Sequence, residues 1–191
     1  MTVTASTPLR RARELDDLTL ARAQHGDAAA FRALVETYQD AVFALVWRLR
    51  GRHAAAAEIE DIAQTTFLGV YRALPRFRAA GPAKLSTWIL TIATRAVLKS
   101  RRGDREIVEL EDLPQLPTQV ARIAQRSFAD ALALALDALP AAYRAVFVLH
   151  AYHELDHAEI ATALEIEPGT VKSRLSRARE HLRAHLKEFA P

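Results

Sequence analysis

The feature that most constrains the fold of this chain is a helical spacing of apolar residues along most of its length. Over residues 31–49 apolar side chains recur every three or four positions, and the same spacing returns over 59–74 and 85–96. Amphipathic helices joined by short loops can share one core. We therefore expect an all-α fold whose first small domain covers residues 19–102.

A short acidic stretch separates two helical regions. Within residues 103–123, the segment 104–117 carries five acids against one arginine and holds two prolines, which is typical of a flexible acidic linker. Helical patterning resumes afterwards, so we expect a second small helical domain over 124–191. Residues 1–18 lack the apolar segment of a signal peptide, and we expect them to form a disordered tail.

Composition excludes several classes of site. The chain has no cysteine, which excludes disulfides, thiolate zinc sites and cysteine nucleophiles. It has no apolar run of about 18 residues, the length needed to cross a bilayer. The net charge of +3 permits nucleic-acid binding. We expect a cytoplasmic protein without a cofactor.

The C-terminal region has the pattern of a helix-turn-helix. A short helix over 159–164 is followed by a turn and by a second helix that is predicted to begin at Thr170, whose hydroxyl can cap it. Ala161 is small where the two helices must cross. Residues 168–187 hold six bases against one acid, and such side chains suit the major groove of DNA.

The string GTVKSRLSRAR over 169–179 resembles region 4 of extracytoplasmic-function (ECF) sigma factors. Ala138-Leu139-Pro140 and Glu159-Ile160-Ala161 belong to the same resemblance. In that family this domain reads the −35 promoter element. The resemblance implies that the DNA contacts come from Thr170, Lys172, Ser173, Arg174, Ser176, Arg177 and Arg179.

The first domain resembles region 2 of the same family. Residues 61–67, DIAQTTF, match the family segment that grips the clamp helices of the polymerase's largest subunit. Helical spacing places Asp61, Gln64 and Leu68 on one face. The resemblance implies a polymerase-binding surface made of Asp61, Gln64, Phe67 and Leu68.

Residues 86–89, STWI, resemble the tryptophan-containing helix beside the −10 recognition surface of the family. Promoter opening requires a base to leave the stack and enter a pocket, with basic groups along the exposed strand. Trp88 lies on the apolar stripe of its helix, which also predicts a core position. The implied −10 contacts are Arg76, Phe77, Arg78, Lys84, Trp88, Arg95, Lys99, Arg101 and Arg102.

Four residues depart from the family pattern. Arg95 and Lys99 stand where the family commonly has asparagine and aspartate, so the −10 preference stays open. Glu154 and Glu165 stand where glycine is usual. Glycine at these two positions is explained by a left-handed backbone, which glutamate adopts at a cost in free energy.

The resemblance implies an alternative sigma factor, not an enzyme, that binds core RNA polymerase and promoter DNA. It also implies an anti-sigma partner, often membrane-bound. Two rival readings concern histidines: residues 153–157 satisfy the H-E-x-x-H zinc protease signature, and His150, His153 and His157 could form a regulatory metal site. A third rival is a stand-alone helix-turn-helix regulator, which would bind DNA without polymerase.

Overall fold

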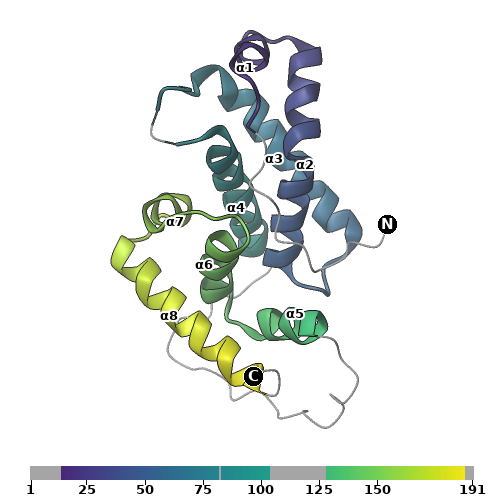
Figure 1. Cartoon of the computed structure of the whole chain (residues 1–191). Coiled ribbons are helices and arrows are strands. Elements are labelled where there is room, and N and C mark those ends of the chain that lie inside the picture. Colours follow the sequence, from purple (N-terminus) through teal and green to yellow (C-terminus); the bar gives the residue numbers. More distant parts are fainter. Residues whose placement is uncertain (1–13, 82, 104–127, 188–191) are drawn as a thin grey trace.

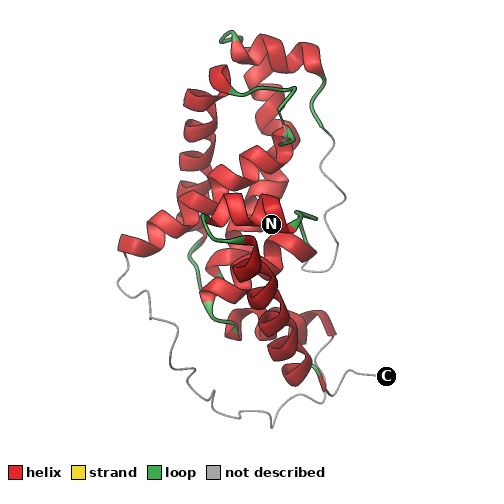
Figure 2. Ribbon diagram, turned by 90° about the vertical axis from the view of Figure 1, so that its left-hand side faces the viewer, coloured by secondary structure: helices red, strands yellow, loops and turns green. Residues whose placement is uncertain are grey.

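The structure, a computed structural model, describes residues 14–81, 83–103 and 128–187, with the backbone alone for 101–103. Every regular element in these ranges is a helix, which confirms the all-α prediction (Figures 1 and 2). The expected acidic linker lies outside the described residues apart from Gly103, and Gly103 ends a helix.

Residues 14–103, the first half, fold into four α-helices and one 3-10 turn. Asp27 caps the longest helix as its pattern suggests, because its carboxylate accepts hydrogen bonds from the backbone N–H groups of Ala29 and Ala30. These hydrogen bonds hold the pKa of Asp27 below its usual value. The elements are α1 (Asp17–Gln24), α2 (Ala28–Arg50), α3 (Ala56–Ala73), η1 (Leu74–Arg76) and α4 (Leu85–Gly103).

The expectation of a disordered tail over residues 1–18 is wrong for residues 14–18. Asp16 caps α1 by accepting a hydrogen bond from the backbone N–H of Thr19 at 2.9 Å. Tyr38 is buried in the core, and its hydroxyl accepts a hydrogen bond from the backbone N–H of Leu15 at 3.0 Å. Residues 1–13 lie outside the described part of the chain.

Residues 128–187, the second half, fold into four α-helices. Pro140 directly precedes the second of them, and a capping box of Asp156 and Glu159 starts the third. Helix α5 begins at Phe128, so the expected start of this half near residue 124 falls outside the described residues. The helices are α5 (Phe128–Ala138), α6 (Ala141–Ala151), α7 (His157–Leu164) and α8 (Pro168–His185).

The two halves share one continuous hydrophobic core. Helix α6 packs against α2 and α7 packs against α4, so the second half lies directly beneath the first in Figure 1. Val46 of α2 and Val146 of α6 are both fully buried in this common cluster. A smaller cluster joins α5 to α8 through Leu136 and Leu182.

Polar contacts reinforce the junction at the end of α2. Asp137 of the second half accepts a hydrogen bond from the backbone N–H of Arg52 at 3.2 Å. Gly51 has a φ of 89°, and a Cβ there would lie 3.0 Å from both Asp137 and Arg144. A side chain at this position would therefore be strained and would collide with the junction.

Candidate nucleic-acid and polymerase interfaces

Helices α7 and α8 form the predicted helix-turn-helix. The chain leaves α7 through Glu165, whose φ and ψ of 56° and 45° are left-handed, and the backbone N–H of Ile166 returns to Ala161 at 3.1 Å. Glu154, in the connection before α7, has a φ of 55°. The expectation of left-handed backbone at these two glutamates is confirmed.

The predicted start of the second helix at Thr170 is wrong by two residues. Helix α8 begins at Pro168, with Glu167 at the N-cap position and no side-chain cap. Proline has a fixed φ and no N–H, so it is favoured in the first position of a helix. Thr170 therefore lies inside the first turn, where its hydroxyl does not cap the helix.

Helix α8 separates an apolar stripe from a basic exposed face. The buried residues, which recur every three or four positions and pack against the rest of the second half, are Val171, Leu175, Ala178 and Leu182. The implied −35 residues occupy the remaining surface: Thr170 and Arg174 are half-buried, and the exposed ones are Lys172, Ser173, Ser176, Arg177 and Arg179. A basic face of this kind can contact phosphates and base edges in a major groove.

Three of the four implied polymerase-binding residues lie together on the surface of α3. Asp61, Gln64 and Leu68 are exposed, and Leu68 has 56% of its surface accessible, whereas Phe67 packs against the core. Tyr71, one turn beyond Leu68, is also about half exposed, at 52%. The sequence reading missed Tyr71, although its i+3 spacing from Leu68 places both on one face. This mixed polar and apolar face suits a protein interface.

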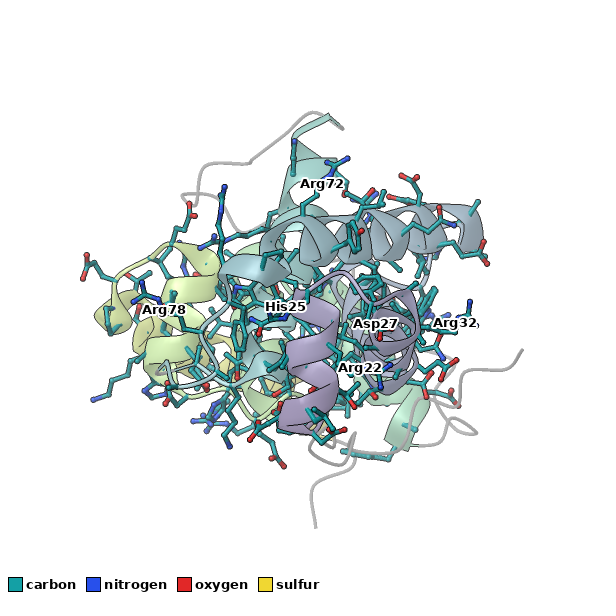
Figure 3. All side chains as sticks on the ribbon, turned by 90° about the horizontal axis from the view of Figure 1, so that it is seen from above. Arg22, His25, Asp27, Arg32, Arg72 and Arg78 are labelled. Atoms are coloured by element: carbon teal, nitrogen blue, oxygen red, sulfur yellow. The ribbon has the colours of Figure 1, made fainter. Side chains whose placement is uncertain are left out.

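The connection from η1 to α4 carries several implied −10 residues. Phe77 and Trp88 pack with ring centroids 4.9 Å apart, and Trp88 is half-buried against the core. Arg76, Arg78 and Lys84 are exposed around this aromatic pair. In Figure 3, Arg78 lies on the opposite side of the view from Arg32, whereas Arg22 lies beside its ion-pair partner Asp27.

Helix α7 engages part of the implied −10 surface. Arg95 of α4 donates a hydrogen bond to the backbone carbonyl of Thr162 at 3.1 Å and pairs with Glu165 at 3.2 Å. Two departures from the family pattern, Arg95 and Glu165, therefore contact each other. Lys99 is exposed, and Arg101 lies in α4 with Arg102, where side chains are not described.

A second contact fastens α7 to α4. The hydroxyl of Thr87, which is buried, donates a hydrogen bond to Glu159 at 3.0 Å. The other carboxylate oxygen of Glu159 accepts from the backbone N–H of Asp156 at 2.9 Å. Glu159 thus starts α7 and attaches it to the first half. The spacing of Asp156 and Glu159 is a sequence signal for the capping box, whereas the contact of Glu159 with Thr87 has no such signal.

The histidines do not form the zinc sites considered from the sequence. Helix α6 ends at Ala151 and α7 begins at His157, so His153 and His157 do not lie on one continuous helix, and the zinc protease reading is wrong. The rings of His150 and His157 lie 5.7 Å apart. No group of three or more possible metal ligands exists among the described residues, which also contradicts the regulatory metal site.

His153 is instead a half-buried side chain at the junction of the halves, and its Nε2 is buried. Burial, with a smaller contribution from the charge of Arg48, lowers the pKa of His153 to about 3. The guanidinium of Arg48 lies 4.2 Å from the centroid of the Tyr152 ring. Within the described structure, Nε2 of His153 and Nη1 of Arg48 are buried without a hydrogen-bond partner. A buried polar atom without a hydrogen-bond partner lowers the stability of the folded state.

No helix in the described ranges is both long enough and apolar enough to span a membrane.

Family models match both halves of the chain. Residues 34–107 match the model described as sigma-70 region 2, and residues 129–182 match the model described as sigma-70, region 4. The first match covers α3 and α4, and the second covers the helix-turn-helix. Each match falls on the half where the sequence resemblance placed it.

Curated relatives agree with the family models. The chain is 32% identical over 178 residues to the ECF RNA polymerase sigma factor SigW of Bacillus subtilis, which covers 86% of this chain and 92% of that protein. It is 30% identical to the ECF RNA polymerase sigma-E factor of Escherichia coli K12, over 86% of this chain and 91% of that one.

The fold also matches two solved structures. CnrH, in complex with the cytosolic domain of CnrY, aligns with a TM-score of 0.63 at 22% identity, over 91% of this chain and 97% of that one. The sigma factor RpoE of Bartonella quintana, in complex with the anti-sigma factor NepR, aligns with a TM-score of 0.62 at 24% identity, over 82% and 96%. On the two family models and these relatives, the chain belongs to the ECF RNA polymerase sigma factors.

Proposed function

We propose that this protein binds core RNA polymerase through the exposed face of α3 and directs it to promoters. In this proposal the basic face of α8 binds the −35 element, and the surface around Phe77 and Arg95 binds the −10 element. The observation that carries the proposal is the presence in one chain of an exposed basic helix-turn-helix and a separate exposed face of mixed polarity centred on Leu68. A DNA-binding regulator does not need the second face.

The mechanism proposed for these surfaces is binding without bond chemistry. Arginine and lysine on α8 neutralise phosphates and bind base edges, which anchors the polymerase upstream. The aromatic pair of Phe77 and Trp88, with Arg76 and Arg78 beside it, is proposed to receive a base that leaves the duplex. Holding that base favours the open promoter, and the polymerase carries out the synthesis.

A regulatory partner is part of the same proposal. Thr162 and Glu165 engage one end of the exposed Arg95 guanidinium, so full contact of Arg95 with DNA requires these contacts to open. The matched Bartonella sigma factor was solved in complex with an anti-sigma factor. We propose that an anti-sigma protein binds this chain and prevents its DNA-binding surfaces from contacting DNA. The anti-sigma protein would act at the membrane or in the cytoplasm, where polymerase acts.

Two measurements with sigma-free core RNA polymerase test the proposal. The purified protein should co-elute with core polymerase in size-exclusion chromatography, and Leu68→Asp should prevent co-elution. In reconstituted transcription on genomic fragments, the wild-type protein should start transcripts at defined sites. DNA binding without co-elution would instead indicate the stand-alone regulator. An absence of specific initiation would overturn the proposal.

A further inference from the structure

Gln24, the last residue of α1, holds the start of the connection between η1 and α4. Its side-chain amide donates hydrogen bonds to the backbone carbonyl of Leu74 at 3.1 Å and to that of Phe77 at 2.7 Å. Gln24 is half-buried, so these bonds are shielded from water. One side chain thereby fixes both ends of the turn that leads to Phe77.

Glu14 holds the other end of the same connection. Its carboxylate accepts hydrogen bonds from the hydroxyl and the backbone N–H of Ser86, at the start of α4. Because the first N–H groups of a helix have no partner within the helix, Glu14 serves as a cap supplied by a distant part of the chain. The buried Tyr38 also donates its hydroxyl to Glu14 at 3.0 Å, which fixes the carboxylate in place.

Gln24 and Glu14 therefore hold the two ends of a segment that carries four of the implied −10 residues. Among the described residues of this segment, Gly81 donates to the carbonyl of Arg78 in a turn, and Phe77 packs on Trp88. A pocket for an extruded base needs its walls held to within about half an ångström. The contacts from α1 and the preceding residues supply that fixation.

We infer that Gln24 and Glu14 are positioning residues for the −10 pocket: they set the conformation of the η1–α4 connection that captures the extruded base. This inference rests on the proposed function. It assigns a role in promoter opening to a part of the chain that precedes both matched family regions, since the region 2 match begins at residue 34. Neither residue touches DNA in this assignment.

Gln24→Glu is the sharpest test, because it keeps the shape of the side chain and replaces the donor amide with a carboxylate that repels both carbonyls. Gln39→Glu is the matched control: it makes the same change on α2, where Gln39 has no side-chain hydrogen bond within the described structure. Glu14→Ala, which removes the cap of α4, is the second variant. It still tests the inference if the Gln24→Glu variant fails to fold.

Each variant is assembled with core polymerase and placed on a promoter mapped with the wild-type protein, with 2-aminopurine in the −10 element to report opening. We expect Gln24→Glu to slow opening about tenfold, and Glu14→Ala to slow it severalfold. Binding of core polymerase and of the −35 duplex should stay within twofold of wild type. A merely structural role would weaken all three together.

The outcomes separate this inference from the proposed function. If the wild-type holoenzyme opens no promoter, the proposed function fails, and the inference fails with it. If wild type opens the promoter, and both variants open it as fast as wild type does, the inference alone is overturned. A loss of core binding or −35 binding that matches the loss of opening also overturns it, as does an equal defect in Gln39→Glu.

Discussion

The two halves of this sigma factor present their proposed DNA-binding residues differently. On α8 most of the basic residues are exposed, and the helix packs on the rest of the second half through its apolar stripe. On α4, Arg95 is engaged by Thr162 and Glu165 of α7. The proposed −35 surface is thus accessible in the described arrangement, whereas part of the proposed −10 surface is occupied by the chain itself.

The difference arises because α7 performs two tasks. It supports α8 within the helix-turn-helix, and it also packs on α4 through Thr87 and Arg95. Any change that loosens α7 from α4 should therefore affect the −10 surface more than the −35 surface. The experiments below test this relation, beginning with the one of largest expected effect.

Arg144→Ala tests how much the junction between the two halves contributes to the free energy of unfolding. Arg144 is buried, donates to the carbonyls of Asp137 and Leu139, and lies 3.5 Å from the carbonyl of Leu49 in the first half. Its removal leaves several buried acceptors without a donor. We expect a loss of about 4 kcal/mol in the free energy of unfolding, measured by urea denaturation.

The control for this change is Arg32→Ala, at an exposed position on α2, which should alter stability by less than about 0.5 kcal/mol. Because the halves share a core, wild type should unfold in a single transition by far- and near-ultraviolet circular dichroism. Two separated transitions in wild type would contradict the shared core.

Acidic pH should weaken the junction through His153. In the unfolded chain a histidine binds a proton near pH 6.5, whereas His153 in the folded protein binds one only near pH 3. Between these values the unfolded state holds the extra proton, so stability is complete above pH 6.5 and falls as the pH falls. The loss is about 1.4 kcal/mol per pH unit, or about 3 kcal/mol by pH 4.5.

Urea denaturation at pH 6.5 and at pH 4.5 measures this loss of stability. The variant His153→Leu separates the part due to His153 from the part due to protonation of other groups. The leucine variant has no imidazole to protonate, so its stability should fall less over the same interval. Equal acid losses in the two proteins would mean that His153 is not protected from protonation.

Arg177→Ala and Arg95→Ala compare the two DNA surfaces directly. Arg177 is exposed on α8, and its loss should weaken binding of the −35 duplex by about 2 kcal/mol, or roughly thirtyfold. Arg95→Ala removes a proposed DNA contact, and it also removes the contacts with Thr162 and Glu165 by which α7 covers the −10 surface. These two effects oppose each other, so the net effect on promoter binding should be smaller. Fluorescence anisotropy of the holoenzyme on a mapped promoter measures both.

Glu180→Gln is the control on α8, because it removes the acid of the basic segment and should leave binding equal or slightly tighter. A loss for Arg95→Ala as large as that for Arg177→Ala would mean that the α7 contact does not compete with DNA.

Glycine at the two left-handed glutamates should give the smallest effects. Glu154→Gly and Glu165→Gly each relieve a positive φ, which favours the folded state by about 1 kcal/mol. Glu165→Gly also removes the ion pair with Arg95, which is exposed on both sides and contributes less than about 1 kcal/mol. Thermal unfolding should thus show the larger gain for Glu154→Gly; the reverse order would contradict this account.

Local patterns predicted the local structure well. Asp27, Gly51 and Pro140 lie at the helix ends that their chemistry indicates, and the apolar stripe of α8 is buried as its spacing required. The start of α8 was wrong because a threonine cap and a proline in the first position compete within three residues, and proline decides the outcome.

Contacts between distant residues could not be read from the sequence. Glu14 meets Ser86 across 72 positions, and Arg95 meets Glu165 across 70. A charged residue at an exposed helical position has many possible partners, and only the packing of the helices selects one. The same limit explains why residues 14–18 were assigned to a tail, and why His153 looked like a metal ligand.

The packing of α7 on α4 makes the helix-turn-helix a ligand that is permanently attached to the surface it covers. A tethered ligand acts at an effective concentration of about a millimolar, whatever the amount of protein in solution. DNA that binds the −10 surface must therefore outcompete a partner that dilution cannot remove. Promoter affinities measured for the free protein report this competition as well as the contact with DNA.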